Sequence, residues 1–439
     1  MSFNIQQVNG LARQYISNTI KKSQYVSIKL CDIATIRLGT TNKEQINTVS
    51  YYDGTYIVNR TVCNKEEIIY DKSILITQNG QHTGNVVISN NPVIVNNNVI
   101  VIIPHEKNNY NYVSNYLKFF AIYCMKNITK TNIENIPVLL PSDEKQNQIV
   151  EFCNTVNNVL SFYTKYRSCK YFDQYVTDQR IADYLIDIVN PLVSDDKSES
   201  FADIAMGRGT IIRSYIEHIN SKGHNIINWK KQNILGCDIN KNIRDIAVLE
   251  CLFYTGQYLD EQFISCDSLK MSTDRKYMNI VSDMPYSSTH NNIKFVVRCT
   301  NMLDDNGKCA IIVANSFLFC DKYAKIRKYL ITSFNIKKII NIDNQFGVSY
   351  GQSIIFFTKT GMTEEINFCE FRINELNHAY EQYMFTVNFD DIVHNKYTLY
   401  PNNYGLYFAK KETGKRQRTK SVCDTSNTAK RNKIIVIDE

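Results

Sequence analysis

Apolar positions in the first third of the chain follow the pattern of strands. Residues 25–141 hold short β-branched runs, and clusters of Asn and Gly separate these runs. Runs of this kind, bounded by turn residues, predict strands at SILIT (73–77), NVVIS (85–89) and NNVIVIIP (97–104). Residues 113–125 have helical spacing instead. We therefore expect a mixed β/α domain in this region.

A long helical pattern follows Pro141. Ser142 precedes acidic and amide residues, which is typical of a helix N-terminus. Apolar side chains recur at helical spacing and form one stripe of Ile149, Phe152, Val156, Val159 and Tyr163. The stripe suits either packing on its own domain, which we favour, or the seam of a homodimer.

Between residues 173 and 361, strand and helix patterns alternate. The seven strand candidates are FADIAM (201–206), NILGCDI (233–239), FISCD (263–267), MNIVSD (278–283), CAIIVA (309–314), IKKIINI (336–342) and SIIFFTK (353–359). Alternation of this kind predicts a mostly parallel sheet that is covered by helices on both faces. Ligands bind such sheets at the carboxyl ends of the strands, so candidate chemistry is sought there.

The chain has 439 residues, a length that suits two or three domains. We expect five segments along it. They are an N-terminal helix (1–23), a β/α domain (24–143), a spacer helix (144–172), the parallel-sheet domain (173–408) and a tail (409–439).

Composition argues against several classes of protein. No stretch approaches the roughly 20 apolar residues of a membrane span, and the first residues lack the apolar core of a signal peptide. The 13 cysteines never form a C-x-x-C pair and the seven histidines are dispersed, so we expect no metal site. The expectation is an intracellular, cytoplasmic protein.

The net charge of +7 lies in the tail. Residues 410–433 contain nine Lys and Arg and two Asp and Glu, so the rest of the chain is neutral overall. Any contact with nucleic acid by the folded part must therefore use local patches. The tail itself reads mainly as a solvated end, with a nonspecific phosphate contact or a nuclear-import signal as the functional alternative.

A glycine-containing turn follows the first strand of the parallel sheet. The run Asp203 to Thr210 holds Gly207 and Gly209, and a helix pattern comes next. Glycines let the backbone approach a ligand closely, and the helix start offers free N–H groups. A simple tight turn explains the run equally well. The G-x-G-x-x-G spacing of nicotinamide enzymes is absent, because residue 212 is Ile.

The next two strands also end in acidic residues. Asp238, followed by Ile239, ends the second strand, and Asp267 follows the third. A carboxylate at the second position accepts hydrogen bonds from ribose hydroxyls in dinucleotide folds. Asp267 is placed to receive the amino group of an adenine ring. Together with Asp203, these carboxylates indicate a bound adenosine.

The fourth strand ends in Asp283-Met284-Pro285-Tyr286. This run resembles the (N/D)-P-P-(Y/F) signature of amino-group DNA methyltransferases. The likeness spans about residues 173–404, which are similar to modification subunits of type I restriction systems. The similar segments include FVVRCTNMLDDNGKCAIIVANSFLF, FGVSYGQSIIFFTKTG and FDDIVHNKYTLYPNNY. The fold implied is α/β, a Rossmann-like seven-stranded class I methyltransferase domain with one antiparallel strand.

The resemblance implies a role for each signature residue. Asp283 and the carbonyl of Met284 would accept hydrogen bonds from the N–H groups of an adenine amino group. Tyr286 would stack on the base after it is flipped out of the duplex. Phe346 is the candidate for the opposite face of that base. Tyr175 and Thr177 resemble the upstream element that holds the methionine part of S-adenosylmethionine. Met284 departs from the signature, which has Pro at this position. A change in the shape of this loop would lower the rate of methyl transfer.

Residues 24–165 resemble one target-recognition domain of a type I specificity subunit. The segments that carry the resemblance are VSIKLCDIATIRLGTT, YDKSILITQNGQHTGNVVI, NNNVIVIIP and IENIPVLLPSDEKQNQIVEF. Gly80 and Gly84 would shape a tight turn. The side chains available around it to read base edges are Gln78, Asn79, Gln81 and His82.

These features together predict an S-adenosylmethionine-dependent N6-adenine DNA methyltransferase that reads double-stranded DNA with its own domain. One alternative is a sequence-specific DNA-binding protein that has lost catalysis. Another is methylation of RNA or of a protein amide. The chain shows no nuclease or helicase segment, so restriction would need a separate endonuclease as partner.

Overall fold

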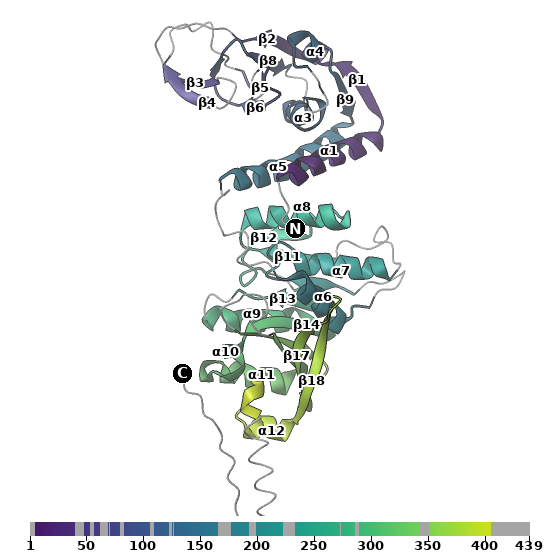
Figure 1. The fold of residues 1–439 in the computed structure, drawn as a ribbon, viewed down its shortest axis with the longest axis vertical. Helices are drawn as coiled ribbons and strands as arrows, with labels where there is room; N and C mark the ends of the chain where they lie inside the picture. The colour runs from purple at the N-terminus through teal and green to yellow at the C-terminus, as the bar shows by residue number, and fades with distance from the viewer. Residues whose placement is uncertain are drawn as a thin grey trace, which may run out of the picture. The chain divides into compact units, whose positions relative to one another are not determined.

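The computed structural model describes residues 5–39, 48–52, 57–61, 69, 71–79, 83–105, 109–122, 125, 127–165, 177–192, 199–222, 233–272, 274–285, 289–342 and 351–404 (Figure 1). The chain forms two compact units. The first comprises Met1–Val176, Gly207–Gly209 and Asp238–Cys266, and the second comprises Thr177–Met206, Thr210–Cys237 and Asp267–Glu439. The predicted tail at 409–439 lies outside the described residues.

Three small sheets lie in the described part of the first unit, and two of them have more than two strands. A four-stranded sheet has the order β2-β8-β5-β6, and a three-stranded sheet has the order β4-β3-β7. Their strands are β2 (Ala34–Leu38), β3 (Thr48–Tyr52), β4 (Ile57–Thr61), β5 (Ser73–Thr77), β6 (Val86–Ser89), β7 (Val93–Val95) and β8 (Val99–Pro104). The three strands that the β-branched runs predicted are thereby confirmed as β5, β6 and β8.

Two further strands join the ends of this β-rich region. β1 (Tyr25–Lys29) pairs antiparallel with β9 (Pro137–Pro141). The short helices around them are α2 (Leu30–Ile33) and α4 (Lys130–Glu134). The region therefore begins and ends at the same place, next to the helices described below.

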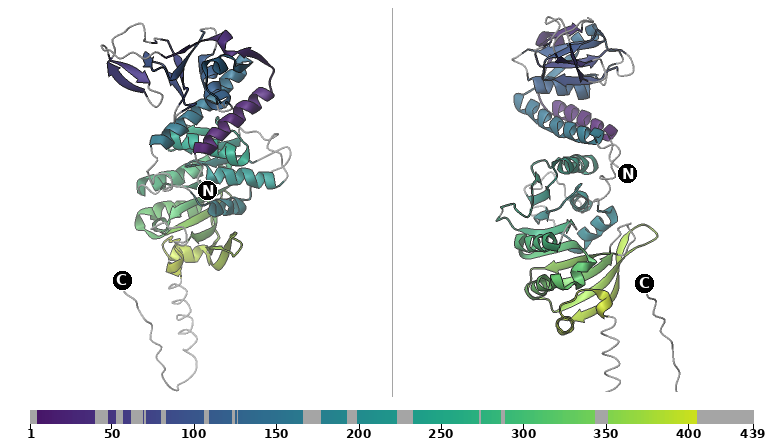
Figure 2. Two further views of the ribbon diagram at one scale, coloured as in Figure 1. Left: turned by 45° about the horizontal axis from the view of Figure 1, so that its top comes forward. Right: turned by 90° about the vertical axis from the view of Figure 1, so that its left-hand side faces the viewer.

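The longer helices of the first unit pack around α5. They are α1 (Ile5–Lys21), α3 (Tyr110–Tyr116), α5 (Asp143–Lys165) and α8 (Lys241–Thr255). α1 and α5 lie side by side (Figures 1 and 2), and α5 also contacts α3 and α8. The helix predicted at 113–125 starts earlier, because the Asn109 side chain caps it by accepting from the Tyr112 N–H at 3.1 Å. It continues as a π-helical turn over Leu117–Ala121.

The apolar stripe of α5 is covered by the chain itself. Ile149, Phe152, Val156 and Val159 are all fully buried. They share one hydrophobic core with side chains of α1 and with Ile246 and Leu249 of α8. The favoured packing on its own domain is therefore the one observed for these four residues, whose buried side chains form no free seam. The side chain of Tyr163 lies outside the described residues.

The large sheet contains nine strands in the order β12-β11-β10-β13-β14-β16-β15-β17-β18. The strands are β10 (Phe201–Asp203), β11 (Ile234–Asp238), β12 (Phe263–Ser265), β13 (Tyr277–Asp283), β14 (Leu303–Ala314), β15 (Asn335–Ile342), β16 (Gln352–Thr358), β17 (Glu365–Ile373) and β18 (Ala379–Asn388). All seven predicted strands are present. β16 is the antiparallel one, since it runs opposite to both β14 and β15.

The expected count of seven strands is too low by two. β17 pairs parallel with β15, and β18 returns antiparallel to β17 as a hairpin. Ile366, Phe368 and Phe371 of β17 are buried, so the strand adds to the core of the sheet. The fold class nevertheless stands, because seven neighbouring strands, from β12 to β15, form the predicted α/β sheet.

Helices cover both faces of this sheet (Figure 2). They are α6 (Gln179–Val189), α7 (Thr210–Ser221), α9 (Thr289–Met302), α10 (Asn315–Phe319), α11 (Ala324–Ser333) and α12 (Phe389–His394). Parallel strands need such crossovers, which bury both faces of the sheet. No helix within the described ranges is long and apolar enough to cross a membrane.

Candidate active site

The carboxylate of Asp283 lies at the carboxyl end of β13, and Thr177 holds it. The Thr177 hydroxyl donates to Oδ2 of Asp283 at 3.0 Å, although the two residues are 106 positions apart in the sequence. The interaction fixes the orientation of the carboxylate before any ligand binds. The next residue, Met284, is 2% exposed, so its side chain is packed into the protein.

A second carboxylate lies on the neighbouring strand. Asp203 ends β10, which pairs parallel with β13, and its side chain is fully buried. Its Oδ1 accepts from the Ser282 hydroxyl at 2.8 Å and from the Ala205 N–H at 3.1 Å. Because Ser282 precedes Asp283, this hydrogen bond to Asp203 stabilises the end of the strand that carries Asp283.

The glycine turn adopts the conformation that only glycine takes easily. Gly207 has φ 53° and Gly209 has φ 76°, in the left-handed region that disfavours side chains. A Cβ atom on Gly209 would lie 3.4 Å from the Cβ of Ala247 in α8. A side chain at either glycine would therefore be strained by the backbone conformation, and Gly209 lies within ordinary van der Waals contact of α8.

Asp238 lies at the end of β11 and interacts with this turn. Its Oδ1 accepts from the Asn240 N–H at 2.7 Å, and the Gly207 N–H also donates to the carboxylate. Burial raises the pKa of the Asp238 carboxyl above its ordinary value of 3.8, while the two backbone N–H groups act in the opposite direction. The adjacent Ile239 is 74% exposed, which leaves an apolar side chain in solvent beside the carboxylate.

Asp267 is engaged in its own turn. Its carboxylate accepts from the Leu269 N–H at 3.1 Å and forms an ion pair with Lys270 at 3.3 Å. Its backbone carbonyl accepts from the Lys270 and Met271 N–H groups. The structure thus gives Asp267 a structural role in this turn.

Three of the predicted catalytic and cofactor-site residues lie outside the described residues, namely Tyr175, Tyr286 and Phe346. The structure brings together Thr177, Asp203 and Asp283 with Met284 in one group, and Gly207, Gly209 and Asp238 in another. Pro285 is partly exposed next to Met284. Within the described ranges, no group of three or more His, Cys, Asp or Glu side chains is placed to hold a metal ion.

The candidate reading loop begins with two described residues, Gln78 and Asn79. Asn98 holds both of them. Its side chain accepts from the Asn79 N–H at 3.0 Å and donates to the Asn79 carbonyl at 2.8 Å, and its carbonyl accepts from the Gln78 N–H at 2.8 Å. This leaves the Asn79 side chain exposed on a fixed backbone. Gln81 and His82 lie outside the described residues.

Sequence reasoning missed three residues that position these groups: Ser282, Arg208 and Asn98. Ser282 and Arg208 were adjacent to quoted motif residues, so their place in the chain pointed to them. The sequence did not reveal their partners, because Asp203 is 79 positions from Ser282 and Glu250 is 42 positions from Arg208. Asn98 lies within the quoted NNNVIVIIP segment, but that segment did not reveal its contact with Asn79.

Two family models match separate parts of the chain. Residues 22–165 match the type I restriction modification DNA specificity domain, and residues 288–384 match the N-6 DNA methylase model. No curated protein matches the sequence.

Several solved structures are similar to the chain at low identity. One is a modification subunit of a type I restriction enzyme from Vibrio vulnificus, with 15% identity, a TM-score of 0.41, and 61% of each chain covered. A methyltransferase subunit from Streptococcus thermophilus has 16% identity and a TM-score of 0.42, with 59% of this chain and 68% of that chain covered. The HsdS subunit from Thermoanaerobacter tengcongensis has 13% identity and a TM-score of 0.31, with 38% of this chain and 48% of that chain covered.

The chain spans about three fifths of the length of the Vibrio subunit, and the family models rather than these structures decide the assignment. Each model falls on one of the two regions that the residues had distinguished. Residues 22–165 are therefore similar to the DNA specificity domains of type I restriction-modification systems, and residues 288–384 are similar to the N-6 DNA methylase family.

Proposed function

We propose that this protein transfers a methyl group from S-adenosylmethionine to the N6 amino group of adenine in a short DNA motif. The observation that carries the proposal is the Asp283 carboxylate at the end of β13, oriented by Thr177 at 3.0 Å. It begins an Asp-Met-Pro-Tyr run directly before the segment that matches the N-6 DNA methylase model.

The proposed chemistry follows from the electronic structure of adenine. The N6 lone pair is delocalised into the ring, so the amino group is a weak nucleophile. Asp283 and the carbonyl of Met284 would accept hydrogen bonds from the two N–H groups of this amino group. These hydrogen bonds draw the nitrogen toward a tetrahedral geometry and direct its lone pair at the methyl group. Positioning and electrostatics supply this effect. Tyr286 and Phe346 would stack on the base after it is flipped out of the duplex.

The residues around β10 and β11 fit an adenosine-containing cofactor. Gly207 and Gly209 have positive φ angles and leave no side chain in the turn, and Asp238 offers carboxylate oxygens suited to ribose hydroxyls. Ile239 offers an exposed apolar surface for a ring. We assign Asp203, Tyr175, Thr177 and Asp267 to the same site on the pattern of the family. The cofactor supplies an electrophilic methyl group on a sulfonium.

Cofactor affinity is expected to fall on acidification through the pKa of Asp238. The ionised carboxylate is the form that accepts two hydroxyl hydrogen bonds, and burial raises its pKa above 3.8. The ionised form is therefore lost at a higher pH than an ordinary aspartate would show. Calorimetric titration of S-adenosylhomocysteine between pH 7 and pH 4 measures this. The Asp238→Asn variant is expected to bind about tenfold more weakly and to lose this pH dependence.

We further propose that the specificity domain reads the DNA with the loop at 78–82, using Gln78, Asn79, Gln81 and His82. Asn and Gln side chains can form paired hydrogen bonds with adenine edges in the major groove. Asn98 would act here as a positioning residue, because it fixes the backbone of Asn79.

The Asn98→Ala variant is expected to lower discrimination between cognate and noncognate DNA by about tenfold, because the Asn79 backbone loses two of its hydrogen bonds. Competition binding with the two DNAs measures the ratio. Asn91→Ala is the matched control on a neighbouring turn, where the Ser89 hydroxyl donates to the backbone carbonyl of Asn91, a contact that the substitution keeps. Equal loss in both variants would remove the special role of Asn98.

The assembly follows from the number of reading domains. A monomer with one domain would read a short asymmetric site, and a two-fold homodimer would read a palindrome or a split site. A separate restriction endonuclease would complete a restriction system. Analytical ultracentrifugation with and without DNA distinguishes the first two assemblies.

The deciding experiment is methyl transfer from labelled S-adenosylmethionine to unmethylated genomic DNA, followed by long-read mapping of modified adenines, with Asp283→Ala as control. N6-methyladenine in one short motif, absent in the control, supports the proposal. Binding of cofactor and DNA without incorporation would instead favour a binding protein that has lost catalysis. Incorporation into RNA alone would favour the RNA alternative.

A further inference from the structure

Helix α8 contacts the candidate cofactor turn on one side and the helices of the DNA specificity region on the other. We propose that α8 is a coupling element, through which DNA binding by the specificity domain strengthens cofactor binding at the glycine turn. The proposal rests on the proposed function, since it assigns the turn to the cofactor and the first region to DNA.

The first contact is a buried ion pair. Arg208, which lies between the two glycines of the turn, donates to the Glu250 carboxylate of α8. The two side chains are only 11% and 3% exposed. A charge pair this deeply buried is held by strong electrostatic attraction, and removal of one partner leaves the other uncompensated. Arg208 therefore fixes the turn to α8.

Two further contacts place the turn on the same helix. Gly209 lies next to α8, because a Cβ added to it would be in ordinary van der Waals contact with the Cβ of Ala247, at 3.4 Å. Gly207 donates its N–H to Asp238, whose carboxylate also accepts the N–H of Asn240, the residue that caps α8. A shift of α8 along its axis would therefore move all three residues of the turn.

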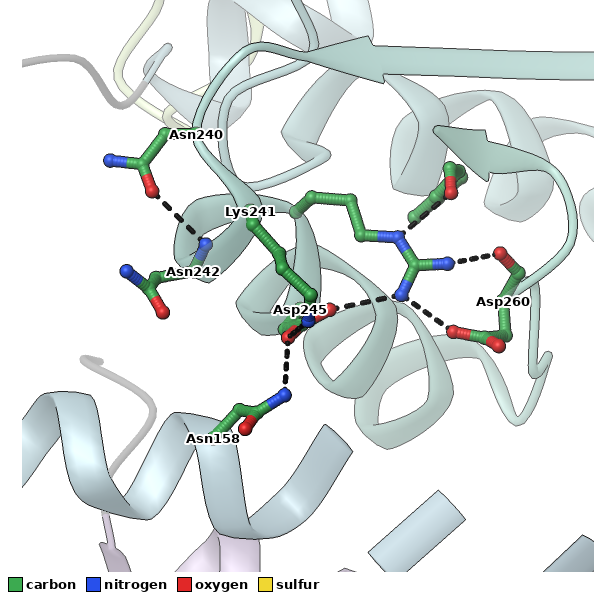
Figure 3. Close-up of polar contacts among 8 residues, drawn as sticks. Asn158, Asn240, Lys241, Asn242, Asp245 and Asp260 are labelled. Atoms are coloured by element: carbon green, nitrogen blue, oxygen red, sulfur yellow. Dashed lines mark hydrogen bonds and ion pairs between the residues drawn. The ribbon is translucent and has the colours of Figure 1, made fainter. Parts of the chain in front are cut away.

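The specificity region contacts α8 through a hydrogen bond to a buried carboxylate. Asn158 of the spacer helix α5 donates to Oδ2 of Asp245 at 3.2 Å, and Asp245 is 1% exposed (Figure 3). Around this bond, Ile246 and Leu249 of α8 share the hydrophobic core that contains Phe152 of α5. The helix that follows the DNA-reading strands is thus bonded and packed to α8.

Asp245 is itself held in place, so the Asn158 contact is transmitted to the helix. Lys241, labelled in Figure 3, donates to the Asp245 carboxylate at 2.9 Å. Arg244 also donates to this carboxylate, at 2.9 Å. Arg244 also forms an ion pair with Asp260 at 2.6 Å and donates to the Phe263 carbonyl at 2.8 Å. A displacement of α5 that moves Asp245 is therefore expected to move α8 as a rigid helix.

The consequence is a reciprocal linkage. If DNA binding orders α5 against α8, it orders the turn that Arg208 joins to α8, and cofactor binding must strengthen DNA binding by the same factor. DNA and the cofactor then each order part of the α5, α8 and glycine-turn structure that the other ligand needs for binding.

The test measures this factor in the full chain without any catalytic step. The affinity for S-adenosylhomocysteine is determined by calorimetry with and without sheared unmethylated genomic DNA, and the ratio of the two affinities is the coupling. We expect a ratio of about five or more in the wild type. In Asn158→Ala the ratio is expected to fall toward one, while both ligands still bind.

Asn157→Ala is the matched control on the same helix. Asn157 accepts from Lys118 at 2.6 Å and donates to Asn115 at 3.3 Å, contacts that stay within the specificity region and do not involve α8. Its ratio is expected to equal that of the wild type. A general loss of stability would change the two variants alike, whereas a coupling through α8 changes only Asn158→Ala.

Arg208 tests the other end of the linkage. Arg208→Ala is expected to reduce the ratio, and Arg208→Lys to restore most of it, because lysine keeps a positive charge near Glu250. An unchanged ratio in Asn158→Ala, or a ratio of one in the wild type, overturns the coupling while the proposed function stands. Failure of the wild type to bind S-adenosylhomocysteine at all overturns the proposed function and the coupling together.

Discussion

Replacing Asp283 with alanine is expected to lower the rate of methyl transfer by about a thousandfold. The carboxylate is the acceptor proposed for the N6 amino group, and its loss removes both the hydrogen bond and the negative charge that activate the nitrogen. Rapid-quench measurement of single turnovers gives this rate. Calorimetry is expected to show S-adenosylhomocysteine binding within about threefold of wild type, because the effect belongs to the reacting state.

Thr177 gives the matched test of the same site. Thr177→Val keeps the shape of the side chain but removes the hydroxyl that donates to Asp283 at 3.0 Å. One hydrogen bond to a charged group predicts a loss of about tenfold in rate. Thr177→Ser keeps the hydroxyl and is expected to retain most of the activity. Full activity in Asp283→Ala would contradict the assignment of Asp283 as the acceptor.

Replacing Arg327 with alanine is expected to destabilise the second unit by about 3 to 5 kcal/mol. The arginine is 1% exposed and lies in α11. Its guanidinium donates to the carbonyl oxygens of Phe317 at 2.9 Å, Cys320 at 2.8 Å and Tyr397 at 2.9 Å. The variant removes a charged donor from each of these carbonyls and opens a cavity, although the Cys320 carbonyl keeps the Tyr323 N–H at 3.0 Å.

Hydrogen exchange of peptides that cover α10 and α11 measures the free energy of local opening in this region. Arg327→Lys is expected to lose about half as much stability, because an ammonium group lacks the planar fork that reaches several carbonyls at once. Lys325→Ala is the control on the same helix. Its exposed side chain predicts a change within about 0.5 kcal/mol. A loss in Arg327→Ala no larger than that of the control would exclude the structural role.

The alternation of β-branched and helical runs was sufficient to predict the large sheet. All seven predicted strands are present, and the acidic residues quoted for β10, β11 and β13 lie at the carboxyl ends of those strands. Hydrophobic periodicity reports local structure directly, because it reflects which face of each element is buried. β17 and β18 were missed although Ile366 and Phe368 show the same alternation.

The helix pattern after Pro141 was also visible in the sequence, but its partner was not. The stripe of Ile149, Phe152, Val156 and Val159 suited two kinds of packing, and its burial against α1 and α8 decides between them. A pattern of apolar residues shows that a face is covered and leaves open what covers it.

The contacts that position the site were decided by the tertiary structure alone. Thr177 meets Asp283 across 106 positions, Asn158 meets Asp245 across 87, and Arg208 meets Glu250 across 42. Asp267 ends in the predicted place, yet its own turn engages its carboxylate. The sequence determined which residues carry carboxylates and where the strands end, because these depend on neighbours along the chain. Only the tertiary structure decided which side chain holds each carboxylate, because hydrogen bonds and ion pairs depend on distances that the fold sets.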